Sequence, residues 1–178
     1  MVAAWEWPSY MDPEAREKGI KVKLSSFKRQ VKNSVSNAKV NGNYVHSIVA
    51  LTEALEDGFD EALMLDTEGF VAEGSVENFF IAKKGVLYSP NLDSCLDGIT
   101  RRTIIDLAEE LNILFKVKQI TVQDVLDADE SFFSGTAAEV VPINSLDNQI
   151  IGAGKRGPIT EKLKTTYFDQ VRGKRDLN

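Results

Sequence analysis

The chain has 178 residues, of which 43% are hydrophobic, and this size and composition are those of a single globular domain. A net charge of −6 and a pI near 4.9 leave no basic surface for nucleic acid, and no apolar run is long enough to span a membrane. Cys95 is the only cysteine, which excludes an internal disulfide, and together with the lack of a signal-peptide pattern at the start it indicates the cytoplasm. His46 is the only histidine, which argues against a histidine metal centre, so no metal is expected.

The chain opens with a polar lead-in over residues 1–19, expected to resemble a linker between domains. It begins abruptly with Trp5 and Trp7, which usually need something to pack against, so the start is expected to be a cut edge. Alternating apolar and polar residues then predict a strand over residues 20–25, where the sheet is expected to begin.

An amphipathic helix is predicted over residues 43–57, with Gly58 as its stop. Its apolar residues at helical spacing, expected to form the buried face, are Tyr44, Ile48, Leu51 and Leu55. Short apolar runs separated by turn residues predict strands over 61–66, 70–73, 78–83 and 86–89. Three antiparallel strands in series are the simplest arrangement for this region.

The second half of the chain alternates helices and short strands. A helix opening at residues 97–100 is expected to bury Ile104, Ile105, Ala108 and Leu111. Thr121 is a good N-cap for a short helix over 122–128, and Pro158 suits the first turn of a helix that runs to about residue 171. The remaining predicted strands are 114–120, 131–134, 139–145 and 149–151. Together these elements predict a mixed α/β domain around one curved sheet.

Lys39 lies just before the start of the first helix. The positive end of the helix dipole and partial burial would both disfavour its ammonium form and leave a nucleophilic amine, which is what a Schiff base needs. Taken alone, the local sequence favours an ordinary surface lysine at Lys39.

Three junctions between a strand or loop and a turn could hold a ligand. Glu73 ends a strand before Gly74, where a carboxylate can pair with a protonated ring nitrogen. Residues 98–100 place free amides and a hydroxyl at a helix start, which suits a phosphate, and residues 135–138 repeat this pattern after an apolar strand. Each junction alone could be a simple turn, but a Schiff-base lysine, an acid and two phosphate turns are the parts of a pyridoxal 5′-phosphate (PLP) site.

At this point the sequence resembles the branched-chain amino acid aminotransferases of PLP fold type IV, the class IV aminotransferases. The motifs that carry the resemblance are 38–44, 61–66, 73–78, 96–101, 135–143 and 157–160, in this order. The similarity extends from about Trp5 to Gly173 and matches the larger, C-terminal domain of that family. It implies a largely antiparallel curved sheet, or pseudo-barrel, with about four helices, in a single PLP-binding domain over residues 1–178 without the family's N-terminal domain.

The resemblance also implies roles for individual residues. Lys39 would form the Schiff base and move the proton between the substrate α-carbon and the cofactor. Tyr44 would hydrogen-bond the ring hydroxyl, and Glu73 would keep the ring nitrogen protonated. The remaining assignments are Leu96 against the ring face, Ile99, Thr100 and Thr136 on the phosphate, Thr136 and Ala137 at the substrate carboxylate, and Glu77 and Asn78 as structural supports of the Glu73 turn.

The family resemblance implies transamination of leucine, isoleucine or valine with 2-oxoglutarate by a homodimer or higher oligomer. Two departures weigh on this: Ser75 and Val76 stand where many relatives carry smaller residues, and the absent domain adds a phosphate-binding arginine and part of the substrate pocket. D-amino acid aminotransferase and aminodeoxychorismate lyase, which use a similar lysine and glutamate, remain alternatives. So does a truncated domain without catalysis that only folds and associates.

Overall fold

A computed structural model of the chain describes residues 17–29 and 38–174. The first half holds β1 (Ile20–Arg29), η2 (Asn41–Tyr44), α2 (Val45–Glu56), β2 (Glu61–Asp66), β3 (Val71–Gly74), β4 (Asn78–Lys83) and β5 (Val86–Ser89). The second half holds α3 (Ile99–Glu110), β6 (Phe115–Val117), α4 (Val122–Leu126), β7 (Glu130–Gly135), β8 (Glu139–Leu146), β9 (Gln149–Ile150) and α5 (Pro158–Val171).

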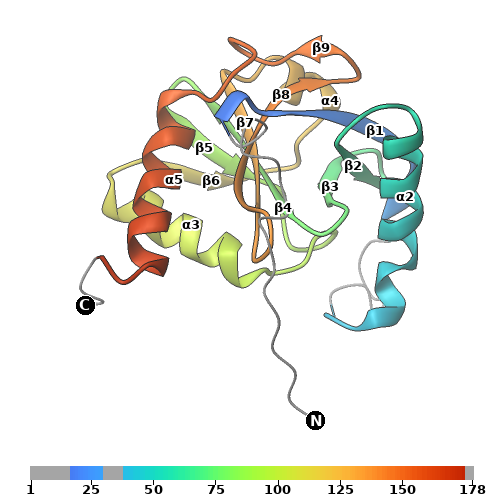
Figure 1. Cartoon of the computed structure of the whole chain (residues 1–178), viewed down its shortest axis with the longest axis horizontal. Coiled ribbons are helices and arrows are strands. Elements are labelled where there is room, and N and C mark those ends of the chain that lie inside the picture. The colour runs from blue at the N-terminus through green and yellow to red at the C-terminus, as the bar shows by residue number, and fades with distance from the viewer. Residues whose placement is uncertain (1–16, 30–37, 175–178) are drawn as a thin grey trace.

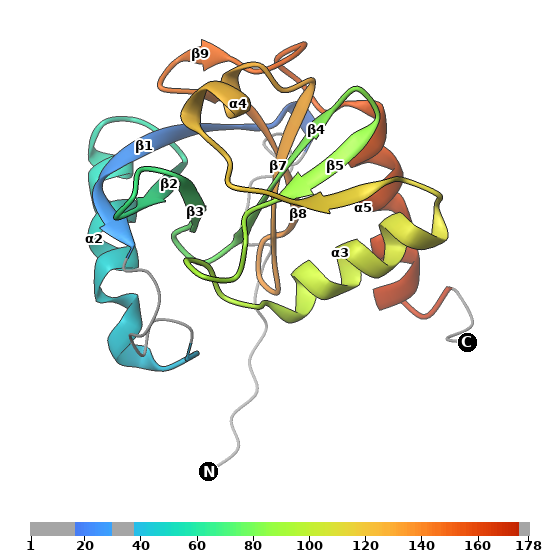
Figure 2. The same cartoon turned by 180° about the vertical axis from the view of Figure 1, so that it is seen from behind.

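The strands form one sheet in the order β3-β2-β1-β8-β7-β4-β5-β6, and β9 pairs with the end of β8. The pairs β1–β2, β1–β8 and β5–β6 are parallel, and the other neighbouring pairs are antiparallel. The sheet curves through the molecule in both views (Figure 1, Figure 2), with the α-helices outside it. The predicted fold class, a mixed and largely antiparallel curved sheet with about four helices, is confirmed.

The middle of the sheet is buried on both sides by paired phenylalanines from β4 and β7. Neighbouring side chains of a strand point to opposite faces, so Phe79 meets Phe133 on one face and Phe80 meets Phe132 on the other. The first pair packs edge to face with ring centroids 5.7 Å apart, and the second is stacked at 4.9 Å. The Phe80 side carries α3 and α5, which lie side by side there (Figure 1), and α2 packs at the other end of the sheet against β1 and β2.

Glu130 of β7 explains the short Gly157-Pro158 motif before α5. Its carboxylate accepts hydrogen bonds from the amides of Ile159 (3.0 Å) and Thr160 (2.7 Å) at the helix start. A Cβ atom on Gly157 would lie 2.2 Å from the Glu130 carboxyl carbon, so only glycine fits. The strand and helix are therefore joined through one buried carboxylate.

Most predicted element boundaries agree with the structure within a few residues. Strands 61–66, 78–83 and 86–89 and the helix 158–171 are reproduced, and Thr121 caps α4 in a capping box with Asp124. Two strands differ more: β1 continues beyond residue 25 to Arg29, while β6 is shorter than predicted. The predicted buried face of α3 is largely correct, since Ile104 and Ala108 are buried and Ile105 and Leu111 pack against the same core cluster.

Two predictions about packing are wrong. The region after β2 is not a simple antiparallel series, because β3 is the edge strand beside β2 whereas β4 lies between β7 and β5. The buried face of α2 consists of small residues, Ser47, Ala50 and Ala54, while Ile48 and Leu55 are 63% and 56% exposed. Small side chains let the helix backbone approach the sheet closely. This close packing, and not the spacing of the large apolar residues, decides which face of α2 is buried.

The predicted cut edge at Trp5 and Trp7, and most of the lead-in over residues 1–19, lie outside the described residues. Within residues 17–29 and 38–174, no helix combines the length and the apolar character needed to cross a membrane.

Candidate active site

A small cavity, partly open to solvent, lies between the segment that contains Lys39 and the connection from β3 to β4. The residues that line it are Arg29, Ala38, Lys39, Asn43, Tyr44, Glu73, Ser75, Val76, Glu77, Asn78 and Leu96. The structure thus brings together four residues that the sequence put forward, Lys39, Tyr44, Glu73 and Leu96, from three separate parts of the chain.

Lys39 precedes η2, as the sequence predicted for a lysine just before a helix start. Its Nζ donates a hydrogen bond of 3.0 Å to the hydroxyl of Tyr44. The segment is closed by its own hydrogen bonds, since the Ala38 carbonyl accepts from the Val40 amide (2.9 Å) and from the Asn43 side chain (2.8 Å). Lys39 is nevertheless exposed, so the partial burial expected for it is not observed.

Glu73 lies on the opposite wall and is 6% exposed. Its carboxylate forms an ion pair with Arg29, with Nε and Oε1 2.6 Å apart, and accepts a hydrogen bond of 2.9 Å from the Leu96 amide. Burial is the largest influence and raises the pKa of Glu73, while the charges of Arg29 and Lys39 and the Leu96 amide act in the opposite direction. The donors around it favour the ionised form that a protonated ring nitrogen would require.

Arg29 is the site residue that the sequence reasoning missed. Its side chain is 11% exposed and reaches Glu73 because β1 runs to Arg29, past the predicted end of the strand at residue 25. Its position at the start of a polar stretch gives no local signal of a binding role. Only the pairing of β1 with β2, which carries β3 and Glu73 beside it, places the two side chains together.

Asn78 joins the Glu73 turn to the loop that precedes α3. Its side-chain amide donates to the Leu96 carbonyl at 2.7 Å and to Glu73 at 3.4 Å. Gly98 allows this contact, since a Cβ there would lie 2.1 Å from Asn78 Oδ1. Asn78 is therefore a support of Glu73, as expected, and it also fixes the loop that carries Leu96.

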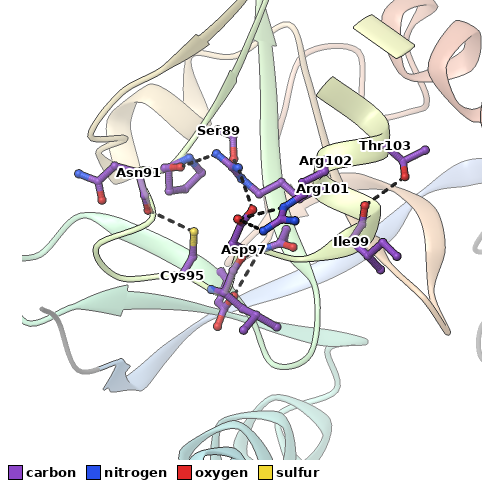
Figure 3. Close-up of polar contacts among 12 residues, drawn as sticks. Ser89, Asn91, Cys95, Asp97, Ile99, Arg101, Arg102 and Thr103 are labelled. Atoms are coloured by element: carbon purple, nitrogen blue, oxygen red, sulfur yellow. Dashed lines mark hydrogen bonds and ion pairs between the residues drawn. The ribbon is translucent and has the colours of Figure 1, made fainter. Parts of the chain in front are cut away.

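The start of α3 is held by arginine contacts (Figure 3). Arg101, which is buried, donates from Nε to Ser89 Oγ at 3.2 Å and lies 3.7 Å from Asp97 Oδ1, while Arg102 also pairs with Asp97. Gly98 is the N-cap and supplies no side-chain cap, so the first amides of α3 are available to a ligand. This is the helix start at which Ile99 and Thr100 were proposed to hold a phosphate.

Neither Ile99 and Thr100 nor Thr136 and Ala137 line the cavity, but both turns adjoin its walls. Gly98 packs on Asn78, and a Cβ on Gly135 would lie 3.2 Å from Glu77 Cγ and 3.5 Å from the Val76 carbonyl. Thr136 and Ala137 are exposed beside that contact. Val76, one of the departures from the family pattern, is 48% exposed and presents a branched apolar side chain to the cavity.

Within residues 17–29 and 38–174, no group of three or more histidine, cysteine, aspartate or glutamate side chains is placed to hold a metal ion. Cys95 lies in the loop before α3 and donates to the Asn91 carbonyl at 3.1 Å (Figure 3). Burial raises the pKa of the Cys95 thiol to about 12, so it stays protonated and unreactive at neutral pH.

Comparison with known proteins points to one family. The model for amino-transferase class IV matches residues 1–146. The branched-chain-amino-acid aminotransferase of Pseudomonas aeruginosa is 55% identical over 179 residues, and that of Escherichia coli K12 is 39% identical over 175 residues. These alignments cover 100% and 97% of the chain but only 58% and 57% of the relatives, so the chain spans little more than half of their length.

Solved structures agree with this comparison. The crystal structure of the Escherichia coli branched-chain amino acid aminotransferase superposes with a TM-score of 0.93 at 39% identity, over 98% of this chain and 58% of that one. The T.th. branched-chain amino acid aminotransferase with pyridoxamine 5′-phosphate gives a TM-score of 0.91 at 44% identity, over 96% and 56%. A further structure of the T.th. enzyme contains N-(5′-phosphopyridoxyl)-L-glutamate and gives 0.90 at 42% identity, with 96% and 55% covered.

Proposed function

Because the chain belongs to the class IV aminotransferase family, we propose that it is the PLP-binding part of a branched-chain amino acid aminotransferase. The reaction would move the amino group of leucine, isoleucine or valine to 2-oxoglutarate, or back from glutamate. The observation that carries the proposal is that an amine, Lys39, and a buried carboxylate, Glu73, line the same cavity.

The side chains around the cavity fit PLP. When bound, PLP supplies an aldehyde that captures an amine and a pyridine ring that takes up electrons. Lys39 Nζ would hold the cofactor covalently and, once the substrate amine replaces it, would move the proton at the substrate α-carbon. The Tyr44 hydroxyl accepts a hydrogen bond from Lys39 Nζ at 3.0 Å, and it would also hydrogen-bond the ring hydroxyl of the cofactor.

Glu73 would hold the proton on the ring nitrogen. Its carboxylate is kept in place by Arg29 and the Leu96 amide, so it need not reorganise when the cofactor arrives. Leu96 would pack against the ring face from the loop that Asn78 fixes.

The two adjoining turns would take the acidic groups. Ile99 and Thr100 at the start of α3, and Thr136 after β7, would bind the cofactor phosphate through amides and hydroxyls. The amides of Thr136 and Ala137 would face the substrate carboxylate. Val76 lines the cavity beside the Gly135 turn and would limit the room for the substrate side chain.

The exposure of Lys39 favours a second possibility, that the chain as it stands binds PLP weakly and has no turnover of its own. An open site admits water, which competes for the cofactor's aldehyde and weakens polar contacts.

We place the protein in the cytoplasm as a homodimer or higher oligomer, and the exposed apolar face of α2, with Val45, Ile48 and Val49, is a surface on which association could occur. Sedimentation at micromolar concentration tests this, and a clean monomer would count against it.

Covalent labelling tests the site directly. The protein is incubated with PLP, reduced with borohydride and digested, and the modified peptide is identified by mass spectrometry. Lys39 should carry the label, and Lys39→Arg, which keeps the charge but lacks the primary amine, should carry none. A label at another lysine, or none in the native protein, would reject the assignment.

A substrate panel separates the alternatives within the fold type. On the complete protein, leucine, isoleucine and valine should be accepted with 2-oxoglutarate in a coupled glutamate assay, whereas a preference for D-alanine or aminodeoxychorismate would identify D-amino acid aminotransferase or aminodeoxychorismate lyase. Turnover on the order of 1 to 100 per second by this chain alone would reject the non-catalytic possibility.

A further inference from the structure

Two buried glutamates lie behind the turn that carries Glu73. Glu61 of β2 is 0% exposed, and Glu77, in the connection from β3 to β4, is 2% exposed. In the described part of the chain neither carboxyl group forms an ion pair with a lysine or arginine. Two carboxylates without a nearby cation are costly to keep ionised in a dry interior.

Their hydrogen bonds show that one proton is needed. Glu61 Oε1 accepts from the amides of Ala62 (2.7 Å) and Ser75 (3.3 Å), and Glu77 Oε2 accepts from the Val76 amide (3.2 Å). The other two oxygens, Glu61 Oε2 and Glu77 Oε1, are buried and have no hydrogen-bond partner among the described residues, while the Ser75 side chain lowers the pKa of Glu61. The amides of Ser75 and Val76, which are neighbours in the chain, bring the two carboxyl groups together, and a hydrogen bond between them would require a proton on one.

We propose that Glu77 is a carboxylic acid at neutral pH and donates its O–H to the Glu61 carboxylate, and that this acid pair positions the Glu73 turn for the ligand of the cavity. The second part rests on the proposed function, and the first does not. Glu61 is the better anion because two amides point at it. Burial raises the pKa of both groups, and that of Glu77 is raised well above its usual value because the charges of Glu61 and Glu73 also act on it.

The acid pair touches both turns that border the cavity. On one side the Gly74 amide donates to the Glu77 carbonyl at 2.8 Å, and a Cβ on Gly74 would lie 2.9 Å from Glu77 Oε2. On the other side Glu77 Cγ lies 3.2 Å from where a Cβ on Gly135 would be. Glu77 therefore fills the space between the turn with Glu73 and the turn before Thr136. Arg29 is ion-paired with Glu73, and the charge of Lys39 also acts on Glu73.

Infrared spectroscopy tests the shared proton without any ligand. The wild-type protein at pH 7 should show the carbonyl band of a buried carboxylic acid, and Glu77→Gln, whose amide can donate to Glu61 in place of the O–H, should fold and lack that band. Glu73→Gln is the matched control and should keep it, because the proton resides on the pair. Absence of the band in the wild-type protein, or its persistence in Glu77→Gln, would overturn the acid pair.

The positioning role is tested by PLP binding, followed by the absorbance of the bound cofactor. Glu77→Met keeps the length of the side chain but removes the donor, and it should raise the PLP dissociation constant about tenfold or more, since a buried acceptor is left unsatisfied. Glu77→Gln should stay within about threefold of the wild type. Equal binding by Glu77→Met and the wild type would reject the positioning role.

If Glu77→Met does not fold, the double variant Glu61→Leu/Glu77→Met replaces both partners by apolar groups and is compared in the same way. If the double variant binds PLP as tightly as the wild-type protein does, the positioning role is rejected as well. A wild-type protein that shows the infrared band but binds no PLP would instead reject the proposed function and leave the acid pair standing.

Discussion

The two walls of the cavity differ in how firmly this chain holds them. The acid wall, defined as residues 73–78 with Arg29 and Leu96, is buried and tied by hydrogen bonds to β1, β2 and the loop before α3. In the lysine wall, residues 38–44, the described hydrogen bonds include several within the segment, and Lys39 is exposed. The acid wall is therefore preorganised by the fold, whereas the lysine wall carries its amine on an exposed side chain.

The difference has a physical basis in where each wall sits in the chain. The acid wall links strands of a single sheet, so moving Glu73 would disturb the core below it. Residues 38–44 precede α2, which buries small side chains and is bonded to β1 through the Glu53 carboxylate. Preorganisation costs no free energy at the moment of binding, so a cofactor should gain its orientation from the acid wall and its covalent bond from the lysine wall.

Removing the acid at the centre of the acid wall should have the largest effect. Glu73→Ala should lower the free energy of unfolding by about 3–5 kcal/mol, because it takes one partner from a buried ion pair. Urea denaturation followed by circular dichroism measures this. Glu73→Gln, which keeps the shape and the contact to the Leu96 amide, should lose less, and a loss below about 1 kcal/mol in Glu73→Ala would show that water readily replaces the carboxylate.

A methyl group placed against the acid wall should lower the free energy of unfolding more than one placed on the lysine wall. Gly98→Ala forces a Cβ to within 2.1 Å of Asn78 Oδ1, and overpacking of this kind costs about 1–3 kcal/mol. Gly42→Ala on the lysine wall is the matched control, since nothing lies within 4 Å of its Cβ, and its effect should stay within about 0.5 kcal/mol. Similar losses for the two variants would mean that the walls are equally rigid.

The acid wall should also give the protein a distinctive pH dependence. Burial raises the pKa of Glu61, Glu73 and Glu77 above the ordinary value of 4.5, so the folded chain binds more protons than the unfolded chain above that pH. Their contribution to stability is complete below about pH 4.5 and is lost as the pH rises through the raised pKa values. Urea midpoints from about pH 4.5 to 8 should fall less steeply in Glu77→Gln than in the wild type, whereas Glu109→Gln, on the exposed side of α3, should leave the slope unchanged.

Loss of the lysine itself should have the smallest effect on stability. Lys39 is exposed, so Lys39→Ala should change the free energy of unfolding by no more than about 0.5 kcal/mol while it abolishes covalent attachment of PLP. Thermal unfolding measures the first quantity and borohydride labelling the second. A loss of several kcal/mol would show that Lys39 supports the fold, which would remove the contrast between the walls.

Local patterns were sufficient where the interactions that define an element lie within it or beside it. The strands 61–66 and 78–83 and the Thr121 cap of α4 follow from residue types a few positions apart. The apolar spacing of α3 also gave its buried face largely correctly, because the sheet and α5 offer that face an apolar partner. The same reasoning failed for α2, whose partner is reached through Ala50 and Ala54.

The candidate site shows the same division. Lys39 and Glu73 could be named from local chemistry, since they stand beside a helix start and a turn, and Tyr44 and Leu96 could be named from the family resemblance of the motifs. Arg29 and the proposed pairing of Glu61 with Glu77 could not, because the residues of the two pairs are 44 and 16 positions apart along the chain and meet only through sheet pairing.

Residue order alone therefore determined the elements, the turns and the types of chemical group that the protein carries. Tertiary structure decided which side of α2 is covered, which cation meets Glu73 and where a buried proton must reside. The reason is that burial and charge pairing depend on the distance between groups in space, and strands far apart in the sequence set that distance here.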